Sequence, residues 1–94
     1  MTETPAVDFG MYVTMLGSQA SIALGLMPNP MTEQTETDLS TAKYLIDVLD
    51  MLKAKTEGNR TDVETKVLMG LLFDLRMKYV EASRTEAVGD AEGE

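Results

Sequence analysis

Apolar and polar residues follow a helical period in three segments of the chain, and the first segment is the most apolar. From Phe9 to Thr32 no residue is charged. Placing successive residues about 100° apart predicts a helix over residues 8–27 with two apolar sectors, one containing Val13 and the other Met11, and a third sector of small residues that includes Gly17. Pro28 and Pro30 end it. A helix that is apolar nearly all round must be buried nearly all round, so we expect other helices or another copy to cover it.

The second segment, residues 38–57, has the pattern of an amphipathic helix that starts after Asp38. Lys43, Asp47 and Asp50 share its polar side, where the first two have the i, i+4 spacing of an exposed ion pair. The pattern therefore predicts one buried and one solvated side. The apolar side carries Ala42, Leu45, Ile46, Val48, Leu49 and Leu52.

A tight turn and a third helix, residues 61–83, follow. Gly58 suits the position just past a helix end, and Thr61 and Glu64 have the capping-box spacing that starts the next helix. The sequence thus predicts a helical hairpin. The third helix has two apolar stripes, of which one comprises Leu68, Leu71, Leu72, Leu75, Tyr79 and Ala82 and the other Met69, Phe73, Met77 and Val80.

These patterns predict an all-α fold with a long apolar first helix followed by an αα-hairpin. We assign residues 8–84 to a single helical domain. Residues 1–7 are expected to be a flexible N-terminus. From Arg84 to the end the chain reads RTEAVGDAEGE, with two glycines and growing negative charge. Residues 85–94 are therefore expected to be a disordered acidic tail.

Size favours self-association. A chain of 94 residues buries only about 60% of the surface that its unfolded form exposes, and the first helix needs more cover than two other helices supply. We therefore expect a homo-oligomeric helical bundle, a dimer or larger. The candidate interface residues are Phe9, Val13, Leu16, Gly17, Ser21, Ile22, Gly25, Met69, Phe73 and Met77.

Composition excludes several classes of partner and site. Sixteen acidic and eight basic residues give a net charge of −8, which repels nucleic acid and anionic membrane surfaces. The chain has neither cysteine nor histidine, so disulfides and ordinary zinc sites are ruled out, and we expect no cofactor. The acidic N-terminus does not resemble a secretory signal, and we expect a cytoplasmic protein.

Acidic residues provide the one pattern with possible catalytic meaning. Asp47 and Asp50 lie at i, i+3 on one helix, and with Asp74 they define an alternative hypothesis, a carboxylate-dependent enzyme of the Mg²⁺ type. A solvated polar face explains the same residues without catalysis. A di-iron site is excluded because its Glu-x-x-His motif needs histidine.

Basic residues gather near the hairpin turn. Lys55 and Arg60 lie there with Asn59, and Arg76 borders an apolar stripe of the third helix. Cations near a helix end already interact favourably with its carbonyl groups, which is the structural explanation of Lys55. The alternative is contact with a partner, and we take all four residues as candidate partner contacts.

The stretches LGSQASIALG, AKYLIDVLDMLKAKTEGNRT and LLFDLRMKYV resemble a family of short bacterial proteins catalogued as a domain of unknown function of the eighteen-hundreds series, with a KTxGNxT-like hairpin. The resemblance covers about residues 9–80 and implies a small all-helical protein with no assigned reaction, cofactor or substrate. The family's recurring positions, carried over here, are Gly25, Pro30, Asp47, Lys55, Thr56, Gly58, Asn59, Thr61, Leu75, Arg76 and Tyr79.

Three functions fit the sequence. The leading hypothesis is a non-enzymatic homo-oligomeric module that binds or scaffolds another protein, because this function needs no residue type that the chain lacks. The second is a membrane-associated regulator that uses the apolar first helix, although Gln19 and Ser21 interrupt the apolar run and its flanks are acidic. The third is the carboxylate-dependent enzyme.

Overall fold

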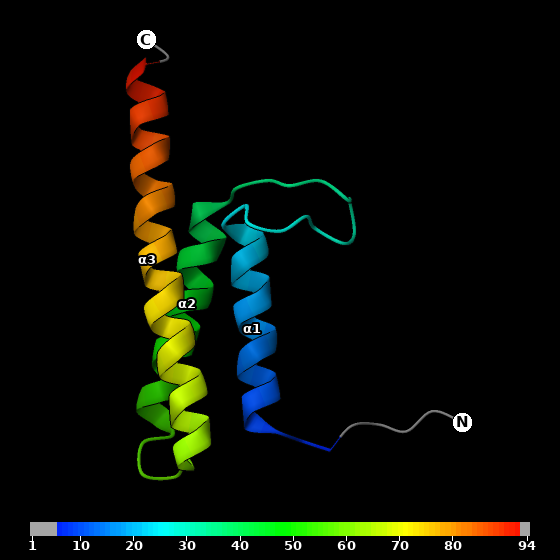
Figure 1. Ribbon diagram of the computed structural model, residues 1–94, viewed down its shortest axis with the longest axis vertical. Helices are drawn as coiled ribbons and strands as arrows, with labels where there is room; N and C mark the ends of the chain where they lie inside the picture. The colour runs from blue at the N-terminus through cyan, green and yellow to red at the C-terminus, as the bar shows by residue number, and fades with distance from the viewer. Residues whose placement is uncertain (1–5, 93–94) are drawn as a thin grey trace, which may run out of the picture.

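A computed structural model describes residues 6–92 as three helices joined by two connections (Figure 1). The helices are α1 (Phe9–Ala23), α2 (Leu39–Lys55) and α3 (Asp62–Glu92). Within the described residues the only β-type pairing is two isolated bridges in the connection between α1 and α2. The predicted all-α fold of three helices is therefore confirmed.

Each helix begins at a side chain that accepts hydrogen bonds from its first turn. The Asp8 carboxylate accepts from the Met11 backbone N–H at 2.8 Å, and the Asp38 carboxylate accepts from the Thr41 backbone N–H and hydroxyl at 3.2 and 2.7 Å. These bonds to Thr41 hold the pKa of Asp38 below its ordinary value. Such caps satisfy the N–H groups that have no partner within the helix.

The start of α3 is the predicted capping box. The Thr61 backbone N–H donates to the Glu64 carboxylate at 2.8 Å, and the Glu64 backbone N–H donates to the Thr61 hydroxyl at 3.1 Å. The turn before it contains Gly58 with a φ of 85°, so α2 and α3 form the expected hairpin.

The core lies where the three helices meet, and every pair of helices is in contact. α2 contributes the apolar side that its pattern predicted, and α3 contributes the stripe that contains Leu68. The position of α1 was not predictable from its own pattern. The buried apolar residues are Val13, Leu16, Ala20, Ala23, Leu24, Ala42, Leu45, Ile46, Leu49, Leu68, Leu72 and Leu75.

α1 ends at Ala23, before the predicted end at residue 27. Gly25 has a φ of 79°, a left-handed conformation that stops the helix, and a Cβ atom at this position would collide with the Thr37 hydroxyl. The Asp38 backbone N–H donates to the Ala23 carbonyl at 2.7 Å. The end of α1 is thereby joined to the start of α2.

α3 is longer than the sequence predicted. We expected it to end near Ser83 and expected residues 85–94 to be disordered, but the helix continues to Glu92, and the last two residues lie outside the described part. The extension contains alanine and glutamate, which favour helix, and its single interior glycine, Gly89, costs only about 1 kcal/mol. Of the expected flexible N-terminus, residues 1–5 also lie outside the described part.

α3 extends past the ends of both other helices and forms one edge of the molecule (Figure 1). Among the described residues, no helix has both the length and the hydropathy that a membrane-spanning segment requires.

Candidate functional site

Four large apolar side chains lie exposed in a row on α3. Met69 is 43% exposed, Phe73 68%, Met77 57% and Val80 51%. They form the second stripe that the sequence predicted, and they line a shallow groove together with Leu72, Arg76, Glu81 and Arg84. We call this surface the outer face of α3.

The outer face exists because α3 is apolar on two sides and only one of them can face its own core. Leu68, Leu72 and Leu75 point toward α1 and α2 and are buried. The four exposed apolar side chains of the outer face are rotated away from that contact, and Leu72 lies between the two sides. A surface helix of a monomer ordinarily carries polar residues there, so a continuous exposed apolar row points to an interaction surface.

Three of the ten predicted interface residues, Met69, Phe73 and Met77, lie on this surface. Sequence reasoning had not included Val80, Glu81 and Arg84 in the candidate interface, although Val80 belonged to the same predicted stripe. These three residues follow Met77 at spacings of three, four and seven, which place residues on one side of a helix. This spacing could have identified them as part of the same surface.

Other predicted interface residues are inside the chain's own core. Val13 and Leu16 are buried, and a Cβ atom at Gly17 would lie 2.9 Å from a methyl carbon of Leu71. A second copy could not reach them, because α3 already covers this side of α1. We therefore remove these three residues from the candidate interface.

The remaining candidates on the first helix offer no continuous surface. Phe9, Ser21 and Ile22 are half-buried, and Gly25 lies in the bend after α1. The part of α1 that stays exposed carries Met11, Tyr12 and Met15 among exposed polar residues. The residues that interrupt it are Thr14, Ser18 and Gln19.

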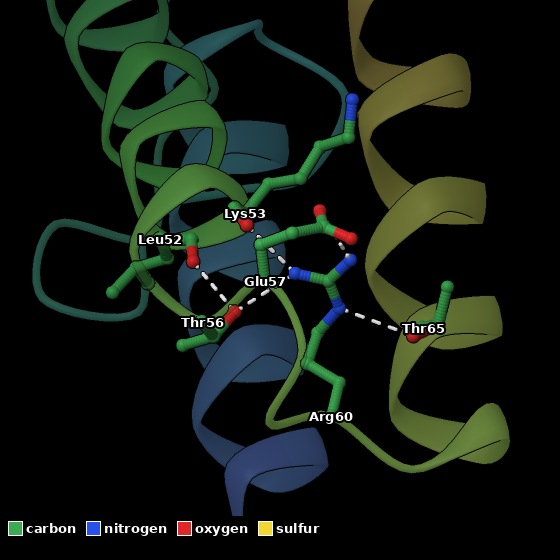
Figure 2. Close-up of polar contacts among 6 residues, drawn as sticks. All are labelled: Leu52, Lys53, Thr56, Glu57, Arg60 and Thr65. Carbon is green, nitrogen blue, oxygen red and sulfur yellow. Dashed lines mark hydrogen bonds and ion pairs between the residues drawn. The ribbon is translucent and has the colours of Figure 1, made fainter.

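Arg60 is part of the hairpin, not an exposed contact residue (Figure 2). Its side chain is only 7% exposed. One guanidinium nitrogen donates to the Lys53 carbonyl at 2.7 Å and to the Thr56 hydroxyl at 2.9 Å, while Nε donates to the Thr65 hydroxyl at 3.1 Å. Arg60 therefore joins the end of α2 to the beginning of α3, and we withdraw it as a partner contact.

The other three predicted partner contacts are accessible. Lys55 and Asn59 are exposed at the turn and do not line the groove of the outer face. Arg76 donates to the Asp50 carboxylate at 2.7 Å, which links α3 to α2, and it also lines the groove of the outer face. Of these residues only Arg76 belongs to a continuous candidate surface.

The three aspartates of the enzyme hypothesis are not brought together. Asp47 pairs with Lys43 at 2.9 Å, Asp50 with Arg76 at 2.7 Å and Asp74 with Lys78 at 2.9 Å. Asp47 raises the pKa of Lys43 by accepting its hydrogen bond. In the described part of the chain no three acidic side chains lie close enough to hold a metal ion.

Comparison with known proteins identifies the family but no activity. A family model described as "Domain of unknown function (DUF1844)" matches residues 6–81, which confirms the resemblance expected from the sequence. The matched residues include α1, α2 and the apolar row of the outer face. No curated protein and no solved structure matches the chain.

Proposed function

Because this chain belongs to the DUF1844 family, whose description assigns no activity, we propose its function from its surface: it is a non-enzymatic protein-interaction module that binds through the outer face of α3. The observation that carries this proposal is the exposure of Phe73, at 68%, in the middle of an apolar row. Aromatic and methionine side chains are enriched at interfaces.

The spacing of the row supports this function. Met69, Phe73, Met77 and Val80 follow one another at intervals of four, four and three residues, which is the pattern of anchors in helix-in-groove recognition. Methionine side chains adapt to irregular partner surfaces. Charged residues at the border, Arg76, Glu81 and Arg84, would form the polar rim that interfaces ordinarily have.

The alternatives have less support. An enzyme built on Asp47, Asp50 and Asp74 would need these carboxylates to act on one substrate, but each has its own basic partner. A membrane regulator built on α1 would need a continuous apolar side on that helix, but Val13, Leu16 and Ala20 are buried in the core, and exposed polar residues interrupt the part that carries Met11 and Met15. The outer face of α3 needs no rearrangement to become accessible.

A photo-crosslinking experiment tests the proposal. A benzophenone amino acid replaces Phe73 in the full chain in its native cells, and Tyr44 on α2 provides a matched control because it is also aromatic and also 68% exposed. We expect a discrete crosslinked product from position 73 and none from position 44. Converting Met69 and Met77 to serine should remove the product. Absence of a product at position 73, or equal products at both positions, would contradict the proposal.

A further inference from the structure

We propose that the outer face of α3 binds a second copy of the same chain, with the two α3 helices antiparallel and a two-fold axis beside Phe73. This inference rests on the proposed function and names the partner of the same surface. A two-fold interface uses one patch on both copies, so that patch must be complementary to itself.

Three residues of the apolar row, Met69, Phe73 and Met77, are arranged symmetrically about Phe73, whereas the position equivalent to Val80 is Lys66. Met69 lies four residues before Phe73 and Met77 lies four residues after it. In antiparallel helices related by a two-fold axis at Phe73, residues equally far before and after it lie opposite one another. Each Met69 then packs against Met77 of the second copy, and the two Phe73 rings meet at the axis.

Glu81 and Arg84 of the outer face, and Asp62 and Lys66, whose helical spacing places them on the same side of α3, are also complementary about this axis. Asp62 and Arg84 lie eleven residues before and after Phe73 and are therefore opposite one another, while Lys66, seven residues before it, lies opposite Val80 and next to Glu81, eight residues after it. Each antiparallel pair would thus bring a basic side chain against an acidic one. Within the described residues none of these four side chains forms an ion pair in its own chain.

Gly70 supports close approach at this surface. It lies inside α3, where glycine is less favourable than alanine, yet a Cβ atom there would have nothing within 4 Å. The folded chain therefore gives no steric reason for a glycine. In the antiparallel arrangement Gly70 lies beside the position of the second copy's Met77, and the missing side chain leaves room for it.

The contact area places the dimer in the class of small interfaces. The segment from Asp62 to Arg84 is about 33 Å long and about 10–12 Å wide, so two copies would bury about 700–800 Å² in total. Stable complexes usually bury at least about 1,200 Å². We therefore expect a weak, concentration-dependent dimer, and it must be measured over a wide range of concentration.

A charge-exchange experiment on the full chain tests the pairing by analytical ultracentrifugation. We expect self-association of the unaltered protein to increase with concentration. Lys66→Glu and Glu81→Lys should each weaken it about tenfold, because each change places like charges at two equivalent contacts. The double variant should recover most of the loss. Phe73→Glu should abolish association, and circular dichroism should show that all variants remain folded.

Disulfide trapping tests the orientation independently, because the natural chain contains no cysteine. We expect Phe73→Cys to form a covalent dimer on mild oxidation, and Tyr44→Cys to form none. A mixture of Met69→Cys and Met77→Cys chains should form the mixed dimer in excess over either self-linked dimer. A monomer at all concentrations, or self-linked Met69→Cys dimers in excess, would overturn the inference. If position 73 photo-crosslinks to a different protein while the chain stays monomeric, the proposed function stands and this inference fails.

Discussion

Substitution of Arg60 by alanine should destabilise the hairpin more than any other change to a charged residue described above. The guanidinium makes three hydrogen bonds of 2.7–3.1 Å to Lys53, Thr56 and Thr65, and its side chain is 7% exposed. Hydrogen bonds of charged groups contribute about 1.5–3 kcal/mol each, but water can replace part of them near a turn. We therefore expect a loss of about 2–4 kcal/mol.

Urea and thermal unfolding followed by circular dichroism measure this loss. For a domain of this size 1 kcal/mol corresponds to about 4–8 °C in Tm, so Arg60→Ala should lower Tm by about 10–25 °C. Arg60→Lys should recover only part of the difference, because an ammonium group lacks the planar fork that reaches several acceptors.

Arg76→Ala is the matched control for Arg60→Ala. It removes an ion pair whose side chains are 51% and 52% exposed, and such pairs contribute about 0.2–1 kcal/mol. A loss below about 0.5 kcal/mol for Arg60→Ala, or a larger loss for Arg76→Ala, would refute the role of Arg60 as the link between α2 and α3.

Four further changes test other parts of the structure by the same unfolding measurements. Leu49→Ala should cost about 2–5 kcal/mol, because Leu49 is fully buried; a cost below that of Leu52→Ala, at a half-buried site, would contradict the described core. Gly25→Ala should destabilise the chain by more than about 1 kcal/mol, since its φ is 79°. Gly70→Ala should stabilise the monomer by about 0.5–1 kcal/mol and weaken self-association. If self-association were unchanged or stronger in this variant, the close approach at Gly70 would be refuted. Because the pKa of Asp38 is lowered by folding from 3.8, its contribution to stability is present above that pH and is lost as the pH falls through the lowered value; Asp38→Asn should flatten this part of the pH profile, and an unchanged profile would refute the role of the cap.

Features that depend on residues close in sequence were predictable. The capping box needs only Thr61 and Glu64 at a spacing of three, and the buried stripe of α3 needs only the helical period. Each is fixed by local geometry, so the neighbouring elements did not have to be known. The end of α1 could not be predicted in this way, because the position of Thr37 beside Gly25 depends on the path of the whole connection to α2.

The orientation of α1 could not be predicted, because a helix that is apolar on nearly every side has no preferred face of its own. Val13 is buried and Met11 exposed, although both belonged to predicted apolar sectors. The neighbouring helices α2 and α3 determine which side of α1 is buried, and on the α3 side Leu71 packs against Gly17. Gly17, which we expected at an interface between chains, instead lets Leu71 of α3 approach α1 within one chain.

Arg60 shows the same limit at the hairpin. From sequence it was an arginine in a turn, next to other basic residues, and contact with a partner was a reasonable interpretation. Its burial depends on acceptors from both sides of the turn, Lys53 and Thr56 before it and Thr65 after it. The two threonines on either side of Arg60 in the sequence could have indicated hydrogen-bond acceptors for it. Both come within hydrogen-bonding distance of the guanidinium only when α2 and α3 are antiparallel.

The two stripes of α3 separate folding from binding. The buried stripe holds the three helices together, whereas Met69, Phe73 and Met77 touch little of the chain's own core. Their exposure therefore has no explanation in the stability of the monomer, since polar residues there would leave the core unchanged and improve solubility. The apolar row therefore fits binding by another molecule and not the folding of the chain. Because the row contributes little to folding, its variants should remain folded, and their association can be measured directly.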